Sequence, residues 1–180
     1  MNRKLVICLA LILLILLIIT LVDYFGRDKY EVITKSQIEH IVATEGITVL
    51  AEERLNERNK PAALIFYEKE IYIGSYSVFN RNGKIEYAKT LTTHKRREKP
   101  VEVLGADGGY SYVMLRVNDK SIQEKMKRIV VTFGNKEVIK DTSPNQFSYI
   151  IVHDEDTHGI SLQTNITIYG EKDEILYNWD

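Results

Sequence analysis

The sequence predicts a mainly β protein, in which an N-terminal transmembrane helix is followed by an antiparallel β-sandwich, or by two packed β-meanders, with one or two short helices. Two observations lead to this fold class. Residues 5–22 form an uninterrupted apolar segment that contains nothing more polar than Cys8 and Thr20. From Ile47 onward, short apolar and alternating segments are separated by turn residues, a pattern typical of antiparallel sheets.

The apolar segment Leu5–Val22 has the length of a membrane span. As a helix with about 1.5 Å rise per residue it would extend roughly 27 Å, close to the ~30 Å hydrocarbon core of a bilayer. A cleavable signal peptide is the main alternative, but Ile18–Asp23 lacks the small-x-small cleavage motif. Arg3 and Lys4 favour a cytoplasmic N-terminus. We therefore expect an uncleaved single-pass anchor that contacts the lipid bilayer of the cell membrane through residues 5–22, with the C-terminal domain outside.

The remainder of the chain divides into a stalk and a domain. Residues 1–22 are the expected anchor, residues 23–35 a polar juxtamembrane stalk, and residues 36–180 a β-rich extracytoplasmic domain, with a subdivision near residues 94–100 as an alternative. The anchor side holds two of the 24 basic residues, which leaves 22 against 25 acidic ones and a net charge of −3. Nucleic acid is therefore not an expected partner, since its binding needs a concentrated basic surface.

A short helix is expected at the start of the domain. Ser36 and Glu39 have the spacing of a capping box, and Gly46 is a typical stop signal. Strands are expected from Ile47 onward, although the charged segment Ala51–Arg58 fits a helix equally well.

Turn residues predict where the strands reverse. Asn80–Gly83 predicts a hairpin turn, and Gly105–Gly109 predicts a turn between two further strands. The same hairpin chemistry, an apolar strand end followed by a short polar turn and an apolar return, occurs in Val78–Tyr87, Thr132–Ile139 and Ile168–Tyr177.

Segments at the two ends of the chain resemble segments of known bacterial proteins. The closing segment Ile166–Tyr177 is similar in texture to the last hairpin of bacterial immunoglobulin-like domains. Together with the anchor at Met1–Val22, it makes the chain resemble small single-pass envelope proteins of Gram-positive bacteria. The resemblance implies an envelope location and carries no functional residues with it.

The densest group of possible metal ligands lies in the segment His153–His158. Its candidate ligands for Zn²⁺ or Ca²⁺ are His153, Asp154, Asp156 and His158. Their spacing matches neither a zinc motif nor a calcium loop, and an acidic loop tip explains the same residues. The sequence therefore predicts no metal site, no cofactor and no catalytic residue.

Two other features of the sequence, a basic run and the tyrosines, are compatible with a binding role. The basic run His94–Lys99 could contact an anionic wall polymer or lipid headgroups, or it could be a solvated loop. The eleven tyrosines could form a binding face, or they could lie in strands with their hydroxyls at the edge of the core.

These observations favour a non-catalytic binding or envelope-interaction module with a protein or cell-wall partner. One alternative is an anchored hydrolytic enzyme that uses carboxylates or the His153–His158 segment. Another is a regulatory subunit of a membrane complex, although Leu5–Val22 has no small-residue face for tight helix pairing.

Overall fold

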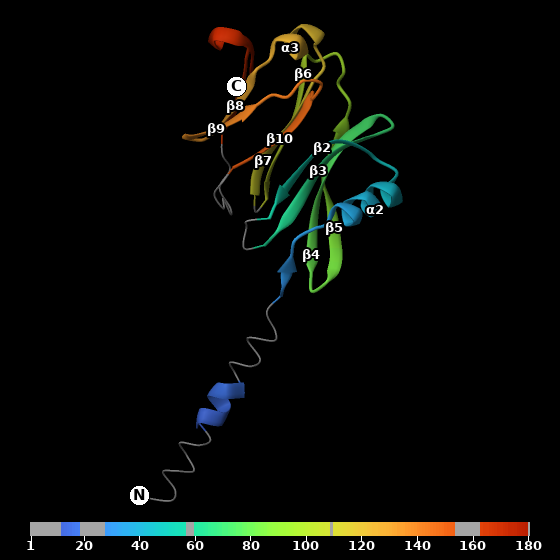
Figure 1. Cartoon of the computed structure of the whole chain (residues 1–180), viewed down its shortest axis with the longest axis vertical. Coiled ribbons are helices and arrows are strands. Elements are labelled where there is room, and N and C mark those ends of the chain that lie inside the picture. The colour runs from blue at the N-terminus through green and yellow to red at the C-terminus, as the bar shows by residue number, and fades with distance from the viewer. Residues whose placement is uncertain (1–11, 19–27, 57–59, 109, 154–162, 180) are drawn as a thin grey trace, which may run out of the picture.

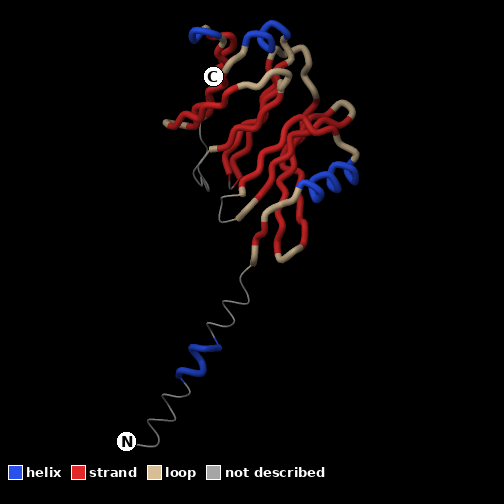
Figure 2. Tube along the Cα trace, in the orientation of Figure 1, coloured by secondary structure: helices blue, strands red, loops and turns tan. Residues whose placement is uncertain are grey.

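The computed structural model describes residues 12–18, 28–56, 60–108, 110–153 and 163–179. Antiparallel strands dominate this part of the chain, with helical turns at its periphery (Figure 2). The expectation of a mainly β, antiparallel fold is therefore confirmed.

Residues 12–18 are helical, and all seven of their large apolar side chains are exposed. Among the described residues, no helix combines the length and the apolar character that a membrane span requires. The other residues of the predicted anchor, 5–11 and 19–22, lie outside the described part of the chain.

The strands form three sheets. Sheet A contains β1 (Tyr30–Glu31), β2 (Thr48–Leu55), β3 (Ala62–Lys69), β4 (Tyr72–Arg81) and β5 (Lys84–His94). Sheet B contains β6 (Val101–Gly108), β7 (Tyr110–Val117) and β10 (Ser148–Val152). Sheet C contains β8 (Arg128–Phe133), β9 (Lys136–Asp141), β11 (Thr164–Tyr169) and β12 (Ile175–Trp179). The helices are α2 (Lys35–Glu45), α3 (Lys120–Lys125) and the 3₁₀ turn η1 (Glu171–Asp173).

The sheets are stacked as successive layers, with α2 on the outer face of sheet A (Figure 1). Sheet B is shared by two apolar layers, one against sheet A and one against sheet C. Strands in the middle of this stack are buried on both faces, as in β3, where residues 62–67 are all buried. Burial on both faces explains why these strands read as continuous apolar runs, whereas β8 alternates between buried and half-buried residues.

The apolar layer between sheets A and B, called the A/B layer below, is built from alternate residues of facing strands. Leu64 and Phe66 of β3 meet Met114 of β7 and Ile150 of β10 there. The next residues along each strand point to the opposite face, so Ile65 packs toward α2 and Leu115 packs toward sheet C. The expected sandwich, or pair of packed meanders, is thus extended by a third sheet.

The chain enters the domain earlier than the sequence suggested. Tyr30 and Glu31 pair with Arg81 and Asn80 of β4, and Ile33 is buried under α2. The expected stalk comprised residues 23–35. Its last part, residues 30–35, therefore belongs to the fold. We call the end of sheet A that carries β1 and the β4–β5 turn the entry end.

The expected helix exists, but its cap lies two residues earlier. Thr34, and not Ser36, is the N-cap, and it forms a reciprocal capping box with Gln37. The buried Ile33 precedes the cap and packs in the same cluster as Ile38, an arrangement that fixes the entry angle of the chain. Gly46 ends the helix with φ +60°, as expected.

The last residue of α2 fastens the helix to the sheet. The Tyr76 hydroxyl donates to Glu45 Oε2 at 2.7 Å, and the Tyr87 hydroxyl donates to Glu45 Oε1 at 3.1 Å. These hydrogen bonds lower the pKa of the Glu45 carboxyl and raise the pKa of the Tyr87 hydroxyl. Because Tyr76 and Tyr87 lie on β4 and β5, the contact ties α2 to two strands at once.

The predicted hairpins are confirmed by strand pairing. β4 pairs with β5, β8 with β9, and β11 with β12. The first turn has Asn82 at φ +54° and Gly83 at φ +77°, the backbone of the tight turn that an Asn-Gly pair favours.

Strand pairing settles two further local features. Ala51–Leu55 belongs to strand β2 and is not helical, because its pairing with β3 overrides the helix-forming charged residues. The predicted reversal within Gly105–Gly109 is confirmed, but it is tighter than expected, because β6 continues through Gly108, which lies opposite Tyr110 of β7.

Candidate functional site

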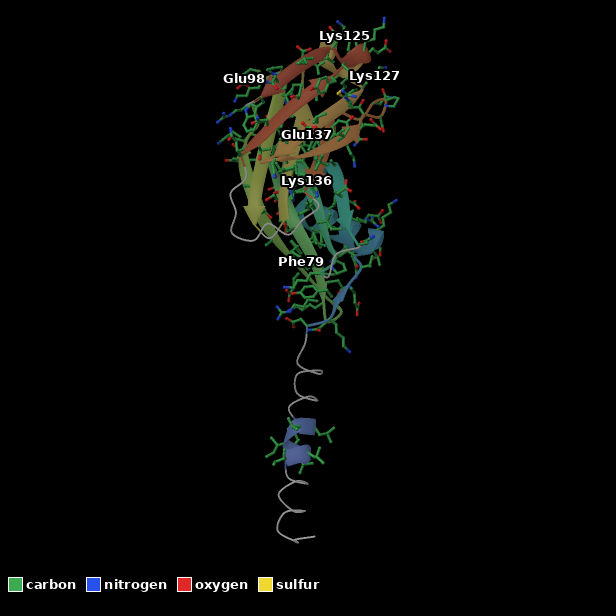
Figure 3. All side chains as sticks on the ribbon, turned by 90° about the vertical axis from the view of Figure 1, so that its left-hand side faces the viewer. Phe79, Glu98, Lys125, Lys127, Lys136 and Glu137 are labelled. Atoms are coloured by element: carbon green, nitrogen blue, oxygen red, sulfur yellow. The ribbon has the colours of Figure 1, made fainter. Side chains whose placement is uncertain are left out.

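At the end of the A/B layer away from β1, charged side chains replace the apolar ones. Glu68 follows Phe66 on one face of β3, and Arg116 follows Met114 on one face of β7. The segment 95–100 crosses this end as it connects β5 of sheet A to β6 of sheet B. We call this region, with Glu68, Arg116 and residues 95–100, the far end. Figure 3 shows Glu98 of this segment at the opposite end of the domain from Phe79.

Glu68 is the centre of an ion-pair network. Its Oε2 lies 2.8 Å from Arg116 Nη1, 3.2 Å from Lys95 Nζ and 3.9 Å from Arg97 Nη2. Burial raises the pKa of the Glu68 carboxyl, but the hydrogen bonds from Arg116 and Lys95 outweigh it, so the net shift is downward. The far end therefore carries three cationic side chains around one ionised carboxylate.

A second carboxylate, Glu102 of β6, is only 3 % exposed. Its Oε1 accepts the backbone N–H of Arg96, and its Oε2 accepts the Asn118 side-chain amide at 3.2 Å. Asn118 also donates to the carbonyl of Lys99 at 3.1 Å. These contacts fix the backbone of segment 95–100 against sheet B, while residues 96–100 stay exposed, so the basic run is a solvated but fastened loop.

One pocket opens between β5 and β6 and has a volume of about 250 Å³. Ile73, Leu91 and Leu104 supply its apolar walls. Its polar lining comprises Thr92, Thr93, His94, Arg96, Lys99 and Glu102.

A second pocket, which we call the amide pocket, has a volume of about 590 Å³. It opens at the same end, where Arg97 and Arg116 meet the turn before β10 and the residues that follow β7. Its polar lining includes Arg97, Arg116, Asn118, Gln123, Asn145 and Gln146. No acidic side chain is among the described residues that line it.

Of the four weak metal-ligand candidates, only His153 lies within the described residues. His153 is 4 % exposed, its ring packs edge-on against Phe133 at 5.4 Å, and its backbone N–H donates to the Ser111 carbonyl. Asp154, Asp156 and His158 lie outside the described part of the chain. In the described ranges, no group of three or more metal-ligating side chains occurs.

The tyrosines do not gather on one face in the described part of the domain. Tyr67, Tyr76, Tyr112 and Tyr149 are buried. Tyr72 and Tyr87 are exposed, but Tyr72 contacts His94 at the far end, whereas Tyr87 bonds to Glu45. A tyrosine-based binding surface therefore finds no support in these positions.

Sequence reasoning pointed to the basic run but missed its partners. Glu68 and Arg116 are 48 residues apart, so their pairing depends on which strands face each other. A usable signal was present: Leu64-x-Phe66-x-Glu68 and Tyr112-x-Met114-x-Arg116 both alternate from apolar residues into a charge, and the two charges have opposite signs.

Comparisons with protein-family models, with curated proteins and with solved structures found no significant match to this chain. The resemblance to Gram-positive envelope proteins therefore stays a prediction.

Proposed function

We propose that this chain is a single-pass membrane protein that presents a non-catalytic binding domain outside the cytoplasm, with its ligand-binding surface at the far end. Residues 5–22 anchor the chain in the bilayer, and Arg3 and Lys4 remain on the cytoplasmic side. The partner is a component of the cell envelope or a protein at the cell surface.

The observation that carries the proposal is the exposed apolar helix at residues 12–18. Each of its large apolar side chains is between 50 % and 60 % exposed. A helix that is apolar all round needs an apolar environment, because exposing such a surface to water is costly. A surrounding bilayer would cover it, and the apolar segment continues on both sides in the sequence.

The direction of the strands supports a ligand away from the bilayer. Register places Arg81 opposite Lys84 at the entry end and Tyr72 opposite His94 at the far end. At about 3.3 Å per residue, β4 separates the two ends by roughly 30 Å. The basic run thus lies far from the point where the chain enters the domain, which favours an envelope or surface ligand over the lipid headgroups of the anchoring membrane.

Topology tests this proposal. In a Cys8→Ala background, Glu137→Cys places one thiol at an exposed position of β9, and Asn2→Cys places one at the N-terminus in a matched control. A membrane-impermeant maleimide should label residue 137 in intact cells and residue 2 only after lysis. Labelling of residue 137 only after lysis would contradict the proposal.

A further inference from the structure

The carboxamides of the amide pocket are oriented by the protein. Gln123 Nε2 donates to the Val117 carbonyl at 2.7 Å, and Gln146 Nε2 donates to the Ser148 carbonyl at 3.2 Å. Asn118 Nδ2 donates to the Lys99 carbonyl. A backbone carbonyl only accepts hydrogen bonds, so each amide must present its nitrogen to the protein. Each amide keeps its oxygen as an acceptor, suited to hydroxyl donors, and all three residues line the pocket.

The two guanidinium groups supply the complementary donors. Arg116 uses Nη1 to contact Glu68, and a guanidinium has five N–H donors in total. The side chain of Arg97 is 66 % exposed and approaches Glu68 only to 3.9 Å. Arginine forks match carboxylates and phosphates well, and Glu68 holds the Arg116 group in place from behind.

The size and walls of the pocket suit a ring-bearing ligand. Its volume of about 590 Å³ falls within the range of small-molecule sites. Leu50 and Phe147 contribute apolar surface beside the polar groups. A ligand that combined an anionic group, several hydroxyls and an apolar ring face would satisfy all three features of the lining.

We infer that the amide pocket binds an acidic saccharide, with its carboxylate or phosphate on Arg97 and Arg116 and its hydroxyls on the oxygens of Asn118, Gln123 and Gln146. The inference rests on the proposed binding function of the far end and names its ligand.

The test is calorimetric titration of the full chain in detergent micelles. Trigalacturonate supplies carboxylates, a glycerol-phosphate trimer supplies phosphates, and neutral galactotriose supplies hydroxyls and rings without charge. Inorganic phosphate measures the effect of charge alone. We expect at least one of the acidic oligomers to bind about tenfold or more tightly than both galactotriose and inorganic phosphate, and the preferred oligomer identifies the anionic group.

Variants locate the binding. Arg97→Gln should weaken the acidic oligomer about tenfold and leave galactotriose unchanged, because Arg97 supplies charge and few structural contacts. Gln146→Met should weaken the acidic and the neutral oligomer alike, since it removes an acceptor for hydroxyls. Arg81→Gln removes an equal charge at the entry end and should change neither affinity.

Three results would overturn the inference: no preference for either acidic oligomer over galactotriose, equal binding of inorganic phosphate, or equal losses in Arg97→Gln and Arg81→Gln. The outcome is separable from that of the proposed function. External labelling of residue 137 without saccharide binding overturns the ligand alone, whereas labelling only after lysis overturns the location.

Discussion

The entry end and the far end of the domain are both closed by polar contacts, but the contacts differ in kind. At the entry end, Arg81 pairs with Asp28 at 2.9 Å, and the Asn82 amide donates to the same residue at 3.2 Å. These groups are exposed and join residues at the surface. At the far end, Glu102 is buried and Glu68 is half-buried where sheets A and B meet.

The polar contacts at the two ends also differ in which parts of the chain they hold in place. Exposed contacts at the entry end pin the incoming chain to the β4–β5 turn, where water competes for every charge. The contacts at the far end orient Arg116 and Asn118 beside pockets that remain open to ligands.

The largest effect should come from the apolar layer that separates the two ends. Phe66→Ala should lower the free energy of unfolding by about 3–5 kcal/mol, because Phe66 is fully buried in the A/B layer and its loss leaves a cavity. Urea unfolding of the full chain in micelles, followed by near-ultraviolet circular dichroism, measures this. Ile139→Ala, at a residue 60 % exposed, should cost about 0.5 kcal/mol or less. Equal costs for the two variants would contradict the burial assigned to Phe66.

Loss of the helix cap near the entry end should have a smaller effect. Thr34→Ala should lower the free energy of unfolding by about 1 kcal/mol, since the backbone N–H of Gln37 loses its acceptor. Ser36→Ala is the matched control and should stay within about 0.5 kcal/mol, because Ser36 is a helical residue and not the cap. The reverse order, with Ser36 the costlier substitution, would place the cap at the position that the sequence suggested.

The ion pairs at the two ends should differ in the coupling energy between their two side chains. A double-mutant cycle on Glu68 and Arg116 should give a coupling energy of about 0.5–1 kcal/mol, because the pair is half-buried and networked. The same cycle on Asp28 and Arg81 should give no measurable coupling, since both groups are solvated. A larger coupling at the entry end would reverse the comparison.

The smallest effect should appear in the pH dependence. The pKa of Glu68 is lower in the folded state than its ordinary value of 4.5, so its ionised form stabilises the fold. This contribution is complete above the ordinary pKa and is lost as the pH falls through the lower folded pKa. Below about pH 5, the free energy of unfolding of the parent chain should fall as the pH is lowered. In Glu68→Gln this fall should be less steep. Identical acid limbs would show that Glu68 titrates as in the unfolded chain.

How far the sequence predicts this molecule depends on the range of each interaction. The hairpin turn at Asn82–Gly83 and the helix stop at Gly46 were predictable, because backbone conformations with positive φ select these residue types locally. The position of the helix cap was not, since Thr34 and Ser36 both offer a hydroxyl, and the burial of Ile33 decides between them.

The third sheet and the candidate site depend on long-range pairing. Continuous apolar runs in β3, β7 and β10 result from burial on both faces, which a single sequence does not distinguish from other buried segments. The basic run at His94–Lys99 was visible as a charge pattern. Its partners Glu68 and Glu102 become evident only when sheet A is placed against sheet B.

The central claim is that the entry end faces the membrane and the far end faces away from it. Fluorescence resonance energy transfer from the protein to the bilayer tests this claim most directly. In a Cys8→Ala background, the full chain is reconstituted into vesicles with acceptor dyes on the lipid headgroups, and a donor dye is attached at Lys84→Cys or Glu98→Cys. Lys84 begins β5 at the β4–β5 turn, and β5 ends at His94, about 30 Å away at the far end, where Glu98 follows. If the entry end faces the membrane, transfer efficiency from residue 84 should be clearly higher than from residue 98. Equal efficiencies, or higher efficiency from residue 98, would contradict it.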